Sequence, residues 1–179
     1  MRIVRLTDEP DPVSRWREIE AIFFASSATT AFPSEAVRAT FFETWTGYYR
    51  ASEPERILLA VASDGTLAGY LTGCADSRGA ERLFKDIELY AVFEDLFTAF
   101  PAHLHVNCRP DQRSRGVGGR LVDAFIEQCR REKLAGVHVV TAVGARNLSF
   151  YRRHGFTHEV TRRWGKDRDL LFLGRPLTD

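Results

Sequence analysis

One stretch in the second half of the chain limits its possible folds more than any other. Residues 102–108 have the pattern of a strand, residues 116–133 carry apolar side chains at helical spacing, and residues 136–143 form another strand-like run. Two strands joined by one helix are expected to lie parallel in a single sheet, with a right-handed crossover. The chain is therefore predicted to have an α/β fold.

Apolar patterns and turn residues indicate the other elements. Residues 56–62 and 66–73 are β-prone runs joined by Ser63-Asp64-Gly65, and a short Asp-Gly connection is typical of a hairpin. A helix is expected to begin near Ser34, and its apolar stripe should face the sheet. That stripe consists of Val37, Phe41, Trp45 and Tyr48. Further strands are predicted over 2–6, 156–162 and 170–175, and further helices over 14–25, 81–100 (two short helices) and 148–154.

Length, charge and cysteine content narrow the class of protein. The 179 residues suffice for one domain with a sizeable core, and the net charge of +1 argues against a general binder of nucleic acid or membrane surfaces. Cys74, Cys108 and Cys129 form no disulfide or zinc pattern, so no metal site is expected and a reducing cytoplasm fits. No signal-peptide pattern or run of about 18 apolar residues is present, so we expect neither secretion nor a membrane span.

The loop at 109–119, between the strand 102–108 and the next helix, has the composition of an anion site. Unsatisfied N–H groups converge at a helix start, the helix dipole places partial positive charge there, and glycines let a pyrophosphate approach the main chain. Arg113 and Arg115 add full charges. The pattern Arg-x-x-Gly-x-Gly over 113–118 differs from the dinucleotide fingerprint, and no Walker lysine is present.

Two motifs make the sequence similar to the GNAT superfamily of N-acetyltransferases. The first, Arg113 to Gly118, matches the family's cofactor motif Gln/Arg-x-x-Gly-x-Gly/Ala, which follows the fourth strand. The second, Asn147 to Phe156, resembles its Asn…Phe-Tyr-x-x-x-Gly-Phe signature. The run 102–107 with Pro110 is also similar to the branch that includes the acetyltransferase-like domain of some O-GlcNAc hydrolases.

The resemblance implies an architecture. It predicts a single GNAT domain over 1–179 with a cofactor core at about 56–156. The sheet is expected to be mixed and mostly antiparallel, with helices on both faces and with a fourth and a fifth strand that splay apart. In the family, pantetheine lies in that gap and pairs with the backbone of the fourth strand.

The resemblance also implies a cofactor, acetyl-CoA, and the residues that hold it. Tyr151 matches the tyrosine that donates a proton to the departing sulfur, although a tyrosine at this place can also serve packing alone. The family asparagine usually lies about seven residues before that tyrosine, where this chain has Gly144, and Asn107 stands where the branch tends to have Asp. The implied cofactor-binding residues are Val106, Cys108, Arg113, Ser114, Arg115, Gly116, Val117, Gly118, Gly119, Asn147 and Tyr151.

Two groups of side chains have open alternatives. His103 and His105 alternate onto one face of their strand and titrate near neutrality, so either can serve as the general base. The same pair can be structural, with a water chain carrying the proton instead. Aromatic residues of the helix after Ser34 can line an acceptor pocket or pack in the core. These are Phe41, Trp45, Tyr48 and Tyr49.

The function implied is an N-acetyltransferase that moves an acetyl group directly from acetyl-CoA to a primary amine of a small molecule or a protein. The alternative is a catalytically silent acyl-CoA-binding sensor or scaffold, and a weaker one is a nucleotide-phosphate binder that uses only the loop. The expected partners are acetyl-CoA and an amine, with neither nucleic acid nor membrane, in a cytoplasmic monomer or homodimer.

Overall fold

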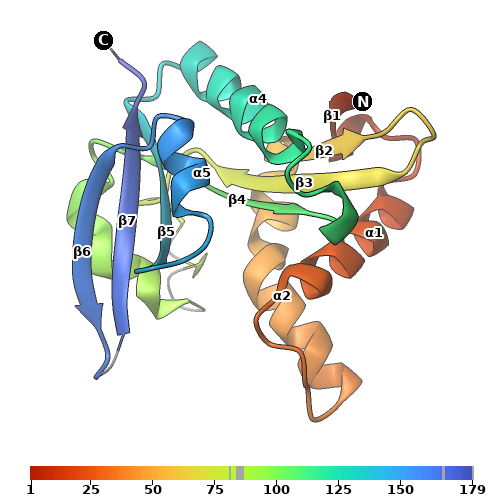
Figure 1. Ribbon diagram of the computed structural model, residues 1–179, viewed down its shortest axis with the longest axis horizontal. Coiled ribbons are helices and arrows are strands. Elements are labelled where there is room, and N and C mark those ends of the chain that lie inside the picture. Colours follow the sequence, from red (N-terminus) through yellow and green to blue (C-terminus); the bar gives the residue numbers. More distant parts are fainter. Residues whose placement is uncertain (81, 84–86, 167, 179) are drawn as a thin grey trace. The chain divides into compact units, whose positions relative to one another are not determined.

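The computed structural model describes residues 1–80, 82–83, 87–166 and 168–178 (Figure 1). The chain forms two compact units. The first consists of Met1–Gly73 with His105–Phe125, and the second of Cys74–Leu104 with Ile126–Asp179. Among the described residues, no helix is both long enough and apolar enough to cross a bilayer.

The strands form a mixed sheet, as predicted. Hydrogen bonding links them in the order β1-β2-β3-β4-β5-β7-β6. β4 and β5 are parallel and pair at Ala102↔Val137 and His103↔His138, whereas β1–β2, β2–β3, β5–β7 and β6–β7 are antiparallel. The bounds are β1 Arg2–Arg5, β2 Ile57–Val61, β3 Leu67–Cys74, β4 Ala102–Cys108, β5 Gly136–Ala142, β6 His158–Trp164 and β7 Arg168–Pro176.

In the first unit, the predicted hairpin joins β2 to β3. The Asp64 carboxylate accepts hydrogen bonds from the Thr66 N–H (3.0 Å) and hydroxyl (2.8 Å). Gly65 has a φ of +85°, a conformation that favours glycine. The Asp-Gly turn chemistry therefore fixes the register in which Ile57 faces Thr72.

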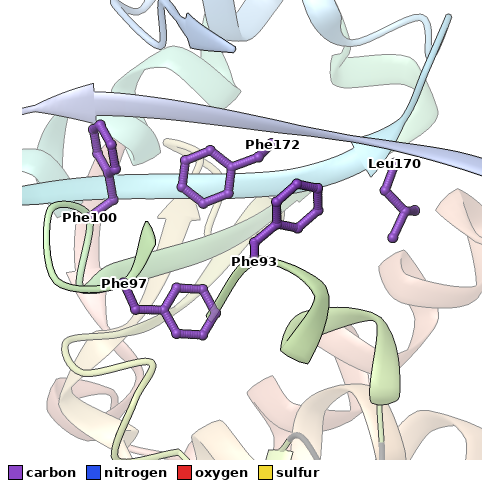
Figure 2. Close-up of a cluster of buried hydrophobic side chains, with 5 residues drawn as sticks. All are labelled: Phe93, Phe97, Phe100, Leu170 and Phe172. Atoms are coloured by element: carbon purple, nitrogen blue, oxygen red, sulfur yellow. The ribbon is translucent and has the colours of Figure 1, made fainter. Parts of the chain in front are cut away.

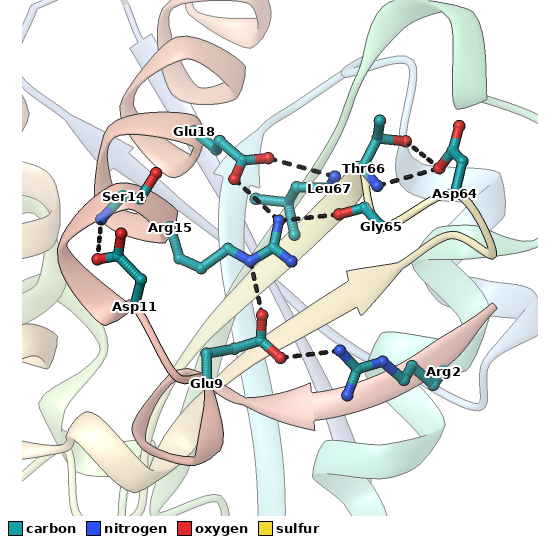
Figure 3. A network of polar contacts seen from close by, with 10 residues as sticks. All are labelled: Arg2, Glu9, Asp11, Ser14, Arg15, Glu18, Asp64, Gly65, Thr66 and Leu67. Atoms are coloured by element: carbon teal, nitrogen blue, oxygen red, sulfur yellow. Dashed lines mark hydrogen bonds and ion pairs between the residues drawn. The ribbon is translucent and has the colours of Figure 1, made fainter.

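A polar network holds the start of helix α1, Pro12–Ser26, against the neighbouring strands (Figure 3). Asp11 caps the helix by accepting from the Ser14 N–H (2.9 Å). Arg15 donates to Glu9 (2.6 Å) and to Glu18 (2.8 Å), and Arg2 donates to the same Glu9 (3.1 Å). Because the Glu9 side chain is only 3% exposed, its two arginine partners are needed to offset the cost of burying the carboxylate.

Helix α2, Glu35–Ser52, begins where predicted, with Ser34 as its cap, but it buries a different face. The buried residues are Phe42, Thr46 and Tyr49, and the Phe42 ring packs 5.4 Å from Trp16 of α1. The predicted stripe is therefore wrong as a core face, because Val37 is 46% exposed and the other three members are half-buried. Two rows of mostly apolar residues at helical spacing, offset by one residue, run along this helix. Their spacing alone does not say which row packs in the core.

Helix α4, Val117–Arg131, follows the loop after β4. Val117, Leu121 and Phe125 are buried on one side of it, at the predicted helical spacing. Gly73 of β3 leaves room for the Phe125 ring, which a Cβ at that position would overlap. The strand therefore needs glycine there for close packing of the helix.

The second unit is built around aromatic rings. Phe93, Phe97, Phe100, Leu170 and Phe172 form its buried cluster (Figure 2). The helical segment predicted over 81–100 includes a 3-10 stretch, Glu88–Leu96, with non-helical dihedrals at Phe93, while Phe84 of that prediction lies outside the described residues. Helix α5, Leu148–Arg153, precedes β6, as predicted. The crowded aromatic pattern thus supplies a core in place of a regular helix.

Candidate functional site

The loop between β4 and α4 leaves a row of backbone N–H groups open. The Gln112 and Arg113 N–H groups bond to the carbonyls of Arg109 and Pro110. Helix α4 begins at Val117, and the Arg120 N–H donates to the Gly116 carbonyl (3.1 Å) at its first turn. Because the first N–H groups of a helix have no intrahelical partner, those at the start of α4 face a ligand site at the positive end of the helix dipole.

The conformation of this loop suits an anion. Ser114 and Gly116 have φ values of +61° and +78°, and left-handed residues of this kind turn nearby N–H groups toward a common point. A Cβ placed on Gly116 would meet no atom within 4 Å, so the space beside the loop is open. Shape and electrostatics together make residues 114–119 the strongest candidate for a phosphate site in the first unit.

The two arginines of the loop differ in their contacts. Arg113 is exposed, and its guanidinium lies 3.5 Å from the Ala25 carbonyl and 3.3 Å from the Ser26 hydroxyl, at the end of α1. Arg115 is also exposed. The predicted contact of either side chain with a phosphate stays a prediction, and Arg113 already has an alternative partner at the helix end.

The end of β4 presents backbone groups and a protonated thiol. Val106, Asn107 and Cys108 are half-buried. Burial raises the pKa of the Cys108 thiol, and the charge of Arg113 opposes this rise only in part. Because a raised pKa keeps the thiol protonated at neutral pH, Cys108 is a poor nucleophile, which is compatible with the predicted role for its backbone alone.

The two candidate histidines lie in different surroundings. His105, in the first unit, is half-buried, and its ring centroid lies 6.3 Å from Trp45 and 5.9 Å from Tyr49 of α2. Burial lowers the pKa of His105 to about 4, so the imidazole is neutral at pH 7 and a weak base. His105 is therefore better suited to accept a hydrogen bond than to carry a full proton.

His103, in the second unit, is a buried core residue. Its Nδ1 lies 2.7 Å from the Ser77 hydroxyl, which lies 2.6 Å from the Pro101 carbonyl. Because a carbonyl only accepts, the Ser77 proton goes to Pro101 and His103 Nδ1–H donates to Ser77. The ring also packs 5.3 Å from Tyr90. This arrangement favours the structural alternative for His103.

A buried phenol near the end of β4 was missed by the sequence analysis. Tyr70 of β3 is 1% exposed, and its hydroxyl accepts a hydrogen bond from the Asn107 amide (3.0 Å). Burial raises the pKa of Tyr70, so the phenol stays protonated. No motif marks Tyr70, and only the pairing of β3 with β4 brings it to Asn107. The pair fixes the orientation of the Asn107 side chain.

A hollow of about 470 Å³ lies between α1 and the turn at 109–111, also within the first unit. Its charged members are already paired, since Arg15 and the Leu67 N–H donate to Glu18 and Arg109 donates twice to Asp111 at 3.1 Å. The remaining lining is apolar. The lining residues are Glu18, Ala21, Ile22, Ala25, Leu67, Arg109, Pro110 and Asp111.

In the second unit, the predicted Phe-Tyr-x-x-x-Gly-Phe motif forms helix α5 and the turn that ends it. Tyr151 is buried, and its ring packs 5.6 Å from that of Phe156. Gly155 has a φ of +80°, and the Arg175 side chain packs over it. Asn147 is exposed and precedes the helix without capping it by its side chain. The motif thus holds the backbone that carries Tyr151.

The predicted site residues accordingly fall into two groups. His105, Val106, Cys108 and the loop 113–119 lie in the first unit, around the end of β4 and the start of α4. His103, Asn147 and Tyr151 lie in the second unit. Each group has the local structure that its motif predicts.

Comparisons with known proteins agree with these features. The model of the acetyltransferase (GNAT) family matches residues 13–156. Among solved structures, SsHAT is 21% identical, with 99% of this chain and 98% of that chain covered and a TM-score of 0.73. The ribosomal-protein-alanine N-acetyltransferase from Brucella melitensis is 19% identical, with 98% and 99% covered and a TM-score of 0.62.

A third similar structure contains the cofactor. It is yncA, a putative acetyltransferase from Salmonella typhimurium with its cofactor acetyl-CoA, 16% identical, with 100% of this chain and 95% of that chain covered and a TM-score of 0.61. At such identities the structures show a common fold, whereas the family model covers most of the sequence itself. The protein therefore belongs to the GNAT family of acetyltransferases, which use acetyl-CoA.

Proposed function

We propose that this chain, acting as one catalytic domain, transfers the acetyl group of acetyl-CoA directly to a primary amine of a small molecule or a protein. The observation that carries the proposal is the loop 114–119, where open N–H groups, left-handed residues and the start of α4 coincide. A pyrophosphate fits this loop because the N–H groups neutralise its charge and Gly116 leaves space beside it.

The remaining cofactor contacts are assigned to backbone groups of β4. Val106 and Cys108 are half-buried at the end of β4, and we assign their backbone groups to pairing with the extended pantetheine. When bound, acetyl-CoA supplies the acetyl group and a thiolate leaving group. A free N–H at this end of β4 is then the group we assign to polarise the acetyl carbonyl, because hydrogen bonds to a developing oxyanion stabilise the transition state.

Two protons must move in the transfer. The amine nitrogen forms a bond to the acetyl carbon as the carbon–sulfur bond breaks, so the nitrogen loses a proton and the sulfur gains one. We assign the donor role to the Tyr151 hydroxyl, since α5 and the Gly155 turn hold this phenol in a fixed place. For the proton of the amine, we assign hydrogen bonding to His105 and final transfer to water, because the imidazole is a weak base there. The Tyr151 phenolate then regains a proton from water, so the proton that nitrogen loses balances the one that sulfur gains.

The test is thiol release from acetyl-CoA over a panel of amines, together with thermal-shift measurements. Acetyl-CoA and CoA should stabilise the protein by about 2.7 kcal/mol at a hundred times their dissociation constants, and ATP and NAD should not. Thiol release that depends on an added amine supports the proposal. Stabilisation by acetyl-CoA without release on any amine would replace it with the silent acyl-CoA-binding module.

A further inference from the structure

Helix α2 carries aromatic side chains that keep accessible surface, although one of them, Phe41, also packs 5.8 Å from Phe23 of α1. The core takes Phe42, Thr46 and Tyr49, whereas Phe41 and Trp45 on the neighbouring stripe are half-buried. Large aromatic side chains that keep accessible surface beside a proposed active site are candidates for contact with a ligand.

These rings belong to a continuous series that ends on β4. The ring centroids of Phe32 and Phe41 are 5.3 Å apart, those of Phe41 and Trp45 are 6.3 Å apart, and those of Trp45 and His105 are 6.3 Å apart. All four side chains are half-buried, and we call them the aromatic strip. The strip runs from the segment between α1 and α2 to the strand whose next residues, Val106 to Cys108, are assigned to the cofactor.

One charged side chain near the strip, Arg38, is already paired. Arg38 lies 3.6 Å above the Phe24 ring and pairs with Glu20 at 3.0 Å and Glu35 at 3.6 Å. The His105 imidazole, at the β4 end, is neutral at pH 7 because burial lowers its pKa to about 4. An aromatic group can pack edge to face along the rings of the strip, whereas a second ammonium group finds no carboxylate among the members of the strip.

We infer that the acceptor is a primary amine with an aromatic body, which lies along Phe41 and Trp45 while its amino group reaches the His105 end of the strip. This inference rests on the proposed acetyl transfer. Edge-to-face contacts between the substrate ring and Trp45 supply orientation as well as apolar contact.

The experiment compares three amines with acetyl-CoA as donor. Benzylamine has a flat ring, cyclohexylmethylamine has a saturated ring of similar size, and spermidine carries additional charges. The expected order of kcat/KM is benzylamine, then cyclohexylmethylamine, then spermidine. Trp45→Ala should lower kcat/KM for benzylamine by about tenfold and leave that for spermidine within about twofold, since an aromatic pair is worth about 0.5–1.5 kcal/mol.

Two variants serve as controls. Trp45→Phe keeps an aromatic ring. If the preference for benzylamine depends on that ring, Trp45→Phe should keep most of the preference that Trp45→Ala loses. Val37 lies on the same helix at an exposed position outside the strip, so Val37→Ala should behave like wild type. Binding of benzylamine to the CoA-loaded protein, followed by ligand-observed NMR, gives a second readout that needs no turnover.

The outcomes separate the inference from the proposed function. The inference is overturned if kcat/KM for spermidine equals or exceeds that for benzylamine, or if Trp45→Ala keeps the preference for benzylamine. Either result leaves acetyl transfer intact. Benzylamine binding that Trp45→Ala abolishes, without turnover of any amine, supports the strip and contradicts the function. Absence of both turnover and binding would overturn the inference, as would a dimer that dissociates in Trp45→Ala.

Discussion

The two halves of β4 carry similar residues in different surroundings. Ala102 to Leu104 are buried, and His103 is locked by Ser77 and packed against Tyr90. His105 to Cys108 are half-buried and lead into the open loop. A histidine at an alternating position of one strand can thus be a core residue, whereas the next one lies beside accessible groups. Burial and hydrogen-bond partners therefore distinguish His103 from His105, although the two have the same residue type.

The largest effect on turnover is expected from Tyr151→Phe. Like His103, Tyr151 is a buried residue of the second unit, so it tests whether burial alone marks a structural residue, because we propose that its hydroxyl donates a proton. The ring and its packing against Phe156 remain in the variant, so acetyl-CoA binding should change little. Loss of a general acid lowers kcat by about a hundredfold to ten-thousandfold. Steady-state kinetics would contradict the assignment if kcat were unchanged or if only KM rose.

The next effect concerns the stability of the buried half of β4. His103→Ala removes a buried ring and leaves the Ser77 hydroxyl without its donor, so the free energy of unfolding should fall by about 2–4 kcal/mol. His105→Ala should cost about 1 kcal/mol or less and reduce turnover instead. Urea unfolding and kcat/KM measurements on both variants check these two predictions. A larger stability loss in His105→Ala, together with a larger turnover loss in His103→Ala, would exchange the roles of the two histidines.

A smaller effect concerns the pH dependence of stability. Burial lowers the pKa of His105 to about 4, whereas an unfolded histidine titrates near 6.5. Between these values the unfolded state binds more protons, so the free energy of unfolding falls as the pH drops through this range. His105→Gln should reduce the loss of stability between pH 7 and pH 5 by about 1–2 kcal/mol, as measured by urea unfolding.

The exposed His158 provides the matched control for that measurement. His158→Gln makes the same change of residue type at an exposed position, so it controls for the substitution itself. If both variants reduced the difference equally, His105 would not be the source.

The smallest effects are expected from the loop arginines. Arg115→Ala should weaken acetyl-CoA binding by about tenfold, as the loss of one charge-assisted hydrogen bond does. Arg113→Ala should cost less, because the Arg113 guanidinium also contacts Ala25 and Ser26. Calorimetric titration with CoA and dephospho-CoA locates the contact, since equal losses place it at the pyrophosphate and unequal losses at the 3'-phosphate. A larger loss for Arg113→Ala would contradict this ranking.

Local chemistry decided which features could be predicted from the sequence. The hairpin at Asp64-Gly65, the glycine loop and the Gly155 turn each need particular residues at fixed spacing, so these positions were found without a structure. The fold class followed from the order of strands and helices. Local patterns carry this information because turn and cap residues act over three or four positions.

Contacts between distant segments decided the features that were missed. The prediction of the buried face of α2 was wrong because Phe41 and Phe42 are both apolar. Only the position of Trp16 on α1 selects Phe42 for the core. The pair of Tyr70 with Asn107 depends on strand pairing across 37 positions, which no motif records. The difference between the surroundings of His103 and His105 depends on the contact of His103 with Ser77, which is also far away in the sequence.

Calorimetric titration of acetyl-CoA into Gly118→Glu tests whether residues 114–119 bind the phosphates of acetyl-CoA. A carboxylate side chain at this position places bulk and negative charge where the pyrophosphate is assigned. We expect at least a hundredfold loss of affinity, with circular dichroism and the melting temperature of the free protein close to those of wild type. If the folded variant binds acetyl-CoA as tightly as wild type, residues 114–119 do not hold the phosphates.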